Sequence, residues 1–153
     1  MITSLLLILM STLLPSAAPG VAQGVAQLLV AEPAEHDFGR VPLSGGNVTT
    51  RFVVTNRGKR AIRLRDVYTS CGCTTAELEF SDGTVAGPFG MPGHDLPVRY
   101  DRELEPGERV EVLVRFDPAA HGPQGVGRVT RAVVLKPVGA PPTEFVFTAT
   151  VIQ

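Results

Sequence analysis

The sequence predicts an all-β domain, an antiparallel sandwich of two sheets with about seven strands, preceded by a signal peptide. Apolar and polar residues alternate with a period of two in several segments after residue 32, as in half-buried strands. The 13 prolines and 16 glycines interrupt the chain at short intervals, which favours many turns over long helices. In the same part of the chain, apolar residues do not recur at the i, i+3, i+4, i+7 spacing of an amphipathic helix.

The first 22 residues have the organisation of a secretory signal peptide. An apolar run, Leu5–Leu14, is followed by Pro15 and then by small residues. Gly20 and Ala22 offer the small side chains that a signal peptidase requires, so we expect cleavage before Gln23. The run is shorter than the roughly 20 apolar residues that span a bilayer, so we expect no stable membrane span after leader cleavage.

These features divide the chain into residues 1–22 as signal peptide, 23–31 as linker and 32–153 as the sandwich domain. A second cleavage site, before Gln27, falls within the linker. The predicted location is therefore outside the cytoplasm, either periplasmic or secreted. Thiols tend to be oxidised there.

The first half of the domain contains three predicted strands. Glu32–Val41 is the first, and residues 47–56 and 61–65 alternate clearly between apolar and polar side chains. Asn56-Arg57-Gly58-Lys59 separates the last two and has the residues of a tight turn, because Asn and Gly accept positive φ. We therefore expect residues 47–56 and 61–65 to form a hairpin.

The second half contains three further strands. Residues 109–117 alternate regularly, and a loop rich in glycine and proline follows at residues 118–127. Residues 129–136 end in consecutive apolar residues, which predicts burial on both faces of the sheet. Residues 144–152 complete the domain with another alternating strand.

Five short motifs occur in a recognisable order along the chain: residues 36–39 (HDFG), 55–58 (TNRG), 70–74 (SCGCT), 106–108 (PGE) and 114–118 (VRFDP). In this order they resemble a bacterial family of exported proteins catalogued only as a domain of unknown function, number fifteen seventy-three. That family is related to the immunoglobulin-like domains of the Hydin and major-sperm-protein type. The resemblance covers about residues 32–152 and implies an immunoglobulin-like sandwich outside the cytoplasm, without an established activity.

The sequence departs from the family pattern between Ser81 and Tyr100, where the family usually has a short connection. Glycines and prolines concentrate in residues 81–97 and predict a long surface loop. We treat this segment as an insertion that could bind a partner.

Cys71 and Cys73 are the only two cysteines, and Gly72 separates them. In an oxidising compartment they are best read as a structural disulfide or as packed thiols at the end of a strand. Two residues of extended chain place the Cα atoms near the upper limit for a disulfide, and Gly72 permits a tighter bend.

Two other interpretations of Cys71 and Cys73 stay open. One is a redox pair for thiol–disulfide exchange, although Arg65 is the nearest cation in the sequence and no helix follows to stabilise a thiolate. The other is a Cu(I) site, because two thiolates suit a soft metal. His36, His94 and His121 are scattered singly along the chain, so we expect no metal site and no cofactor.

Charge and motifs argue against several functions. The 14 basic and 15 acidic side chains leave a formal charge of −1, and no aromatic residues interleave with the basic residues 57–65, so we expect no nucleic-acid partner. The acidic residues between 101 and 111 lack a calcium-loop pattern and are interpreted as a solvated turn. No catalytic motif is present, so we expect no catalytic residues. The sequence thus predicts a non-catalytic binding or assembly module that contacts a protein through a sheet edge or the 81–97 loop.

Overall fold

The computed structural model describes residues 28–153. The predicted signal peptide and residues 23–27 of the predicted linker lie outside the described residues. Within residues 28–153, no helix has the length and apolar character needed to cross a membrane.

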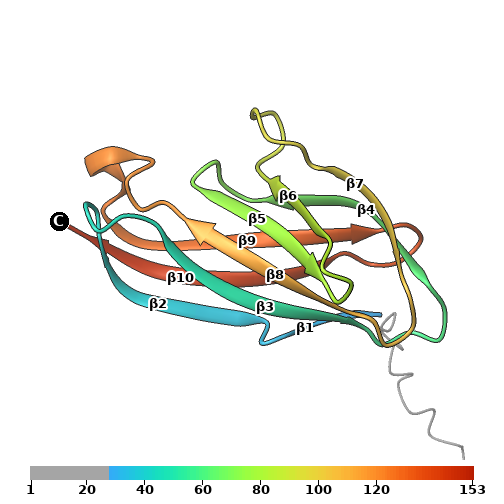
Figure 1. Cartoon of the computed structure of the whole chain (residues 1–153). Helices are drawn as coiled ribbons and strands as arrows, with labels where there is room; N and C mark the ends of the chain where they lie inside the picture. The colour runs from blue at the N-terminus through green and yellow to red at the C-terminus, as the bar shows by residue number, and fades with distance from the viewer. Residues whose placement is uncertain (1–27) are drawn as a thin grey trace, which may run out of the picture.

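Ten strands form two five-stranded sheets that pack face to face (Figure 1). The first sheet has the order β1-β3-β8-β5-β6, with β1 Leu29–Glu32, β3 Val48–Asn56, β8 Arg109–Phe116, β5 Thr74–Phe80 and β6 Val85–Phe89. The second has the order β2-β10-β9-β4-β7, with β2 Glu35–Pro42, β10 Thr143–Ile152, β9 Gly127–Pro137, β4 Ile62–Thr69 and β7 Arg99–Leu104. The predicted all-β, immunoglobulin-like sandwich is confirmed, with ten strands instead of about seven.

The pairing of neighbouring strands is antiparallel except between β2 and β10, which run parallel. A single short 3-10 helix, η1 (Gly122–Gly125), interrupts the loop between β8 and β9 within the described residues. The long 118–127 connection is therefore a loop with one helical turn, much as the sequence predicts.

The first strand begins earlier than the predicted domain. Leu29–Glu32 pairs with β3 in register from Leu29↔Asn56 to Glu32↔Val53. Leu29 is only 1% exposed, because its side chain fills the edge of the apolar core. Residues 29–31, which we assigned to a linker, therefore belong to the sandwich.

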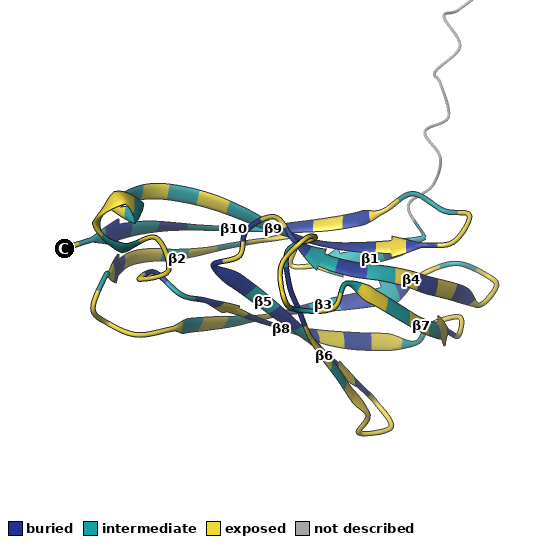
Figure 2. Cartoon of the chain, turned by 90° about the horizontal axis from the view of Figure 1, so that it is seen from above, coloured by how far each residue is buried: buried dark blue, intermediate teal, exposed yellow. Residues whose placement is uncertain are grey.

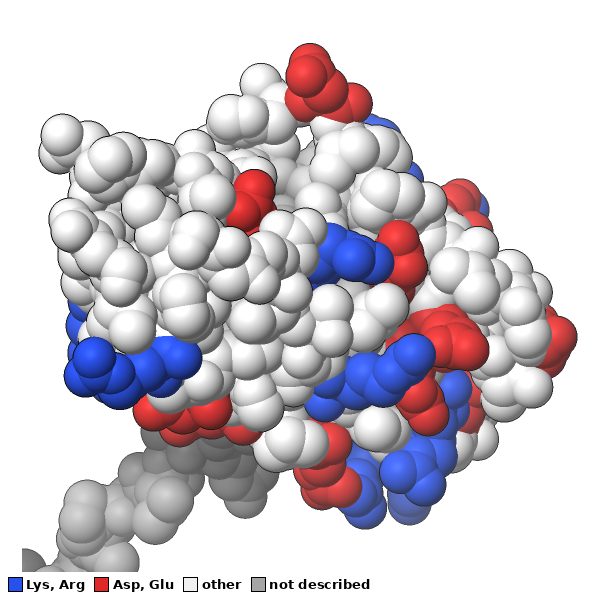
Figure 3. Space-filling model, turned by 60° about the vertical axis from the view of Figure 1, so that its left-hand side comes forward, with Lys and Arg blue, Asp and Glu red and all other residues white. Residues whose placement is uncertain are grey.

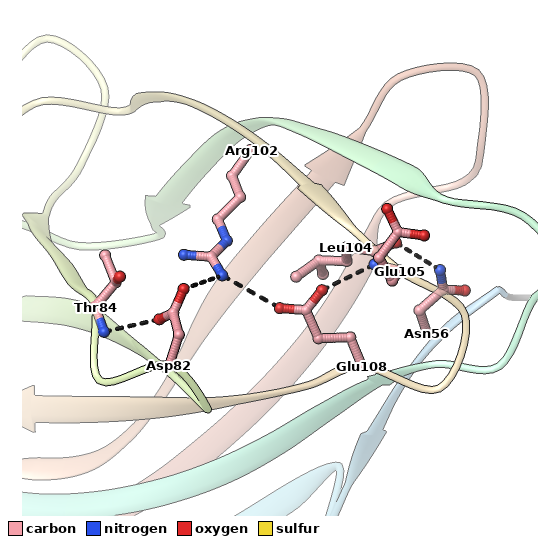
Figure 4. Close-up of polar contacts among 7 residues, drawn as sticks. All are labelled: Asn56, Asp82, Thr84, Arg102, Leu104, Glu105 and Glu108. Atoms are coloured by element: carbon pink, nitrogen blue, oxygen red, sulfur yellow. Dashed lines mark hydrogen bonds and ion pairs between the residues drawn. The ribbon is translucent and has the colours of Figure 1, made fainter.

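The predicted hairpin over residues 47–65 is wrong, because β3 and β4 lie in different sheets. Asn56 is fully buried where the chain crosses between them. Its Nδ2 donates hydrogen bonds to the carbonyl oxygens of Leu104, at 2.8 Å, and Arg60, at 2.9 Å. Its Oδ1 accepts from the Gly58 N–H at 2.8 Å, and the contact with Leu104 appears in Figure 4. The Asn56 side chain, which we predicted to form a turn, thus holds in place the connection between the two sheets.

Alternating side chains of both sheets fill the interior, as Figure 2 shows by the alternation of buried and exposed residues along the strands. The Phe52 and Phe145 rings, one from each sheet, lie 4.7 Å apart and join the two layers. Val133 and Leu135 are fully buried and Val134 is 9% exposed, which confirms the predicted two-sided burial of β9. Each large apolar side chain buried in this way stabilises the fold by about 1.5–3 kcal/mol.

The 81–97 segment is more ordered than predicted. It contains β6, which pairs with β5 at one edge of the first sheet, and then crosses to β7 at the edge of the second sheet. Arg102 on β7 fastens its base, because its Nη2 lies 2.9 Å from Asp82 and 3.3 Å from Glu108 (Figure 4). The same guanidinium lies 3.7 Å from the centre of the Phe80 ring.

Glu108 shows that the acidic stretch is not simply a solvated turn. Its carboxylate accepts a hydrogen bond from the Glu105 N–H at 2.8 Å and pairs with Arg102, while its side chain is 16% exposed. This carboxylate therefore closes the turn between β7 and β8 and links it to the inserted segment.

Candidate functional site

Cys71 and Cys73 lie in the turn between β4 and β5 and form a disulfide. Their Cα atoms are 5.2 Å apart, within the usual range for this bond. The two residues are 7% and 3% exposed, so the sulfurs belong to the end of the apolar core.

Hydrogen bonds to Thr69 and Ser70 hold the disulfide turn in place. The Thr69 hydroxyl lies 3.0 Å from the carbonyl oxygens of both Cys71 and Thr74. Ser70 makes two hydrogen bonds with Ala132 on β9. The Ser70 N–H donates to the Ala132 carbonyl at 3.0 Å, and the Ser70 Oγ accepts from the Ala132 N–H at 2.9 Å.

The turn is also fastened to the first sheet. The Cys73 carbonyl accepts a hydrogen bond from the Asp117 N–H at 2.9 Å, directly after β8. The disulfide therefore has a fixed position between the two layers of the sandwich.

Two side chains from distant parts of the sequence contact the sulfurs. His121, immediately before η1, places its Nε2 3.3 Å from the Sγ of Cys71. Arg131 on β9 donates a hydrogen bond from its Nε to the Sγ of Cys73 at 3.4 Å. His121 and Arg131 thus contact the cysteines in the folded chain, although Arg65 is the nearest cation in the sequence. The contacts join residues 50 and 58 positions apart, which no local motif in the sequence reveals.

The 81–97 segment reaches the same turn through His94. A Cβ atom placed on Gly72 would lie 3.3 Å from His94 Cε1, so the imidazole rests closely on this glycine. Three loops thus meet at the disulfide. We call residues 70–75, 90–97 and 118–127 the disulfide surface. His36 lies elsewhere, on β2, with its ring 4.6 Å from that of Phe38.

The disulfide surface is almost free of charge, since Asp95 is its only Lys, Arg, Asp or Glu residue. Figure 3 brings forward the end of the molecule that carries η1 in Figure 1, and a broad area of this face shows neither basic nor acidic side chains. Arg131, beside this surface, makes no ion pair with a carboxylate of the described residues, and its Nη1 donates to the Thr130 carbonyl at 2.8 Å.

The opposite end of the sandwich has a different character. A hollow of about 720 Å³ lies there between residues 57–62 and 138–140, and Leu28 contributes to its wall. Its lining contains no histidine, cysteine or carboxylate, so it lacks a nucleophile with an adjacent base. The only cysteines of the chain lie at the disulfide surface.

Comparison with known proteins supports the fold. Residues 29–85 match the model of a family described as "Protein of unknown function (DUF1573)". A protein of unknown function from Porphyromonas gingivalis W83 superposes with a TM-score of 0.55 at 18% identity, over 84% of this chain and 50% of that one. This chain therefore spans about half the length of that protein.

Two further solved structures have lower TM-scores. The ASH/PapD-like domain 7 of human CEP192 gives a TM-score of 0.47 at 14% identity, over 96% of this chain and 97% of that domain. The secreted serine protease VesC of Vibrio cholerae gives 0.47 at 13% identity, over 76% of this chain and 22% of the protease. No curated protein matches the chain. The resemblance seen in the sequence is confirmed over residues 29–85, where the DUF1573 model matches, and this segment lies within the β-sandwich.

Proposed function

We propose that this protein is an exported, non-catalytic binding module that holds a protein partner on its disulfide surface. The observation that carries this proposal is the meeting of three loops, from distant parts of the chain, at one fixed turn. Gly72, His94 and His121 are exposed at this turn, whereas Cys71 and Cys73 beneath them are buried. Loops presented by a rigid β-scaffold commonly form binding sites.

The chemistry of the surface favours a protein over a charged polymer. The centres of protein interfaces are depleted of charged residues and enriched in side chains such as methionine. The disulfide surface has one charged residue and presents Met91, which is partly exposed, and Val126, which is 41% exposed. A nucleic acid would require basic side chains or stacking aromatics, and residues 70–75, 90–97 and 118–127 contain neither.

The four edge strands are less suitable as the main contact, and the first of them, β1, has only 4 residues. β6 contains Pro88. β2 has a register shift against β10 at Gly39, where φ is 66° and the Asp37 carboxylate accepts a hydrogen bond from the Gly39 N–H. β7 alternates charged side chains outward at Arg99, Asp101 and Glu103. Proline, irregular backbone and charge are the features that discourage strand addition at an edge.

Export is part of the same proposal. The apolar segment and small residues of positions 1–22 support it. The Cys71–Cys73 disulfide also supports it, because disulfides persist in oxidising compartments such as the periplasm.

A second candidate function is thiol–disulfide exchange, and Arg131 is the observation that favours it. A guanidinium beside Cys73 would stabilise the thiolate released when the bond opens. Against this, Cys71 and Cys73 are only 7% and 3% exposed, so the thiolate of a protein substrate has much poorer access to a sulfur than a small dithiol has. The reduction potential of the bond separates the two functions, because a value below about −300 mV marks an inert structural disulfide and a much higher one marks an exchange catalyst.

Site-specific photo-cross-linking tests the binding proposal. A photoreactive phenylalanine analogue replaces His94, Gln124 or, as the control, Lys59 at the opposite end of the sandwich. In cells of the source organism we expect the same cross-linked protein from positions 94 and 124 and none from position 59. Cross-linking only from position 59, or from none of the three, would contradict the proposal.

A further inference from the structure

We propose that Cys71 and Cys73, once reduced, bind one Cu(I) ion together with His121. The two Sγ atoms and one imidazole nitrogen of His121 all lie within 4.8 Å of one another. Three ligand atoms are therefore close together, and reduction of the disulfide would free both sulfurs to move apart around an ion. This inference goes beyond the binding function and does not depend on it.

The kind of ligand selects the kind of ion. Thiolate sulfur prefers soft cations such as Cu(I), and imidazole also binds copper. Structural zinc almost always has four protein ligands, and zinc with three protein ligands takes water or substrate as the fourth, whereas Cu(I) needs no ligand beyond the three that the described residues gather here. Calcium and magnesium require oxygen ligands, which this group lacks. The ligand set thus fits a three-coordinate Cu(I) ion best.

The surroundings match the charge of the loaded site. Two thiolates and one Cu(I) ion carry a net charge of −1, and a buried charge is costly unless a partner compensates it. Arg131 supplies a positive charge at 3.4 Å from Cys73 Sγ and has no carboxylate partner among the described residues. Beside the neutral disulfide, the positive charge of Arg131 has no carboxylate partner among the described residues. The charge of −1 on the reduced, Cu(I)-loaded site would compensate it.

Further donors hold the sulfur ligands in place. The Cys73 N–H donates to Cys71 Sγ at 3.1 Å, and the Thr74 hydroxyl lies 3.6 Å from Cys73 Sγ. Such outer contacts orient ligands and raise metal affinity. The exposed position of His121 lets an ion reach the sulfurs from solvent.

The redox step balances with a dithiol as the reductant. The dithiol gives two electrons and two protons to the Cys71–Cys73 bond, becomes a cyclic disulfide, and leaves two protein thiols. Cu(I) then displaces both thiol protons into the buffer, while the neutral imidazole donates its lone pair.

The test is a Cu(I) competition titration of the purified protein. The protein is reduced with dithiothreitol, freed of it under argon, and titrated with Cu(I) in the presence of bathocuproine disulfonate. We expect one Cu(I) per chain in a monomeric complex, and none in the oxidised protein. His121→Ala removes one of the three ligands and should weaken binding by at least about 10- to 100-fold, the range found when outer partners of metal ligands are removed. His36→Ala, the matched control, should bind as the wild type does.

Several outcomes would overturn the proposal. They are absence of Cu(I) uptake by the reduced wild type, a stoichiometry of one ion per two chains, or unchanged affinity in His121→Ala. If the variant does not fold, the copper X-ray absorption spectrum of the loaded wild type decides: two sulfurs and one nitrogen support the site, and an all-sulfur shell excludes it. Cross-linking detects a bound protein and the titration detects bound Cu(I), so either proposal can fail without the other.

Discussion

His121 lies 50 residues after Cys71 in the sequence, yet its Nε2 is 3.3 Å from the cysteine sulfur. The contact exists because the loop before β9 folds back over the turn between β4 and β5, while Asp117 ties the start of that loop to Cys73. With Arg131 on the second sulfur, each half of the disulfide has its own nitrogen partner.

Arg131→Gln should slow reduction of the disulfide by dithiothreitol. The guanidinium stabilises the departing Cys73 thiolate, and a less stabilised leaving group departs more slowly. Arg128→Gln is the matched control, because Arg128 is exposed on the same strand. The measurement is the rate at which thiols appear, followed by alkylation and mass. Equal rates in both variants would show that Arg131 does not act on the sulfur.

Asn56→Ala should lower the free energy of unfolding by about 2–4 kcal/mol. The substitution removes three hydrogen bonds and leaves the buried Leu104 carbonyl without its donor. Asn47→Ala, at an exposed position before β3, should change stability by less than about 0.5 kcal/mol. Urea denaturation of both variants measures the difference. A similar, small loss in both would mean that the amide does not fasten the crossing between sheets.

Gly87→Ala should destabilise the protein more than Gly83→Ala does. Both glycines have positive φ, 112° and 81°, so alanine is strained at either position by about 1 kcal/mol or more. Only at Gly87 does the new Cβ also meet backbone, at 2.9 Å from the Ala76 carbonyl oxygen, whereas nothing lies within 4 Å at Gly83. Thermal unfolding of the two variants tests whether β6 is packed on β5 as described, and equal melting temperatures would show that it is not.

Asp82 should make the fold sensitive to strong acid. Hydrogen bonds from the Thr84 backbone and side chain, and then from Arg102, lower the pKa of this carboxyl from 3.8 to about 2. Because the folded state favours the ionised form, the stabilisation is complete above about pH 4 and disappears as the pH falls through about 2. Asp82→Asn should therefore lose less stability than the wild type between about pH 5 and about pH 2. Urea midpoints at the two pH values provide the comparison, and parallel losses would contradict the assignment.

The sequence predicts strands well where alternation and burial coincide. Val110, Val112 and Val114 occupy every second position of β8 and all three are fully buried. The predicted hairpin is wrong because a turn sequence does not show which sheet the next strand joins. Residues suited to a turn, such as those at positions 56–59, occur both within one sheet and between two sheets. Only tertiary contacts, such as Asn56 to Leu104 across 48 positions, decide between these topologies.

The candidate site was predictable only in part. Cys71 and Cys73 stand out as the only cysteines, and Gly72 between them permits the bend. His121 and Arg131 carry no local signal, since each reaches the sulfurs through strand order and loop path. The role of His94 was hidden for the same reason, because a segment that reads as an irregular loop is held against the disulfide turn by β6 and β7.

Amide hydrogen exchange of the oxidised protein, alone and bound to its cross-linked partner, tests the central claim most directly. If the disulfide surface is the binding site, the partner should slow exchange in residues 70–75, 90–97 and 118–127, and leave the edge strands β2, β6 and β7 unchanged. Protection confined to an edge strand, with the three loops exchanging as in the free protein, would contradict the account.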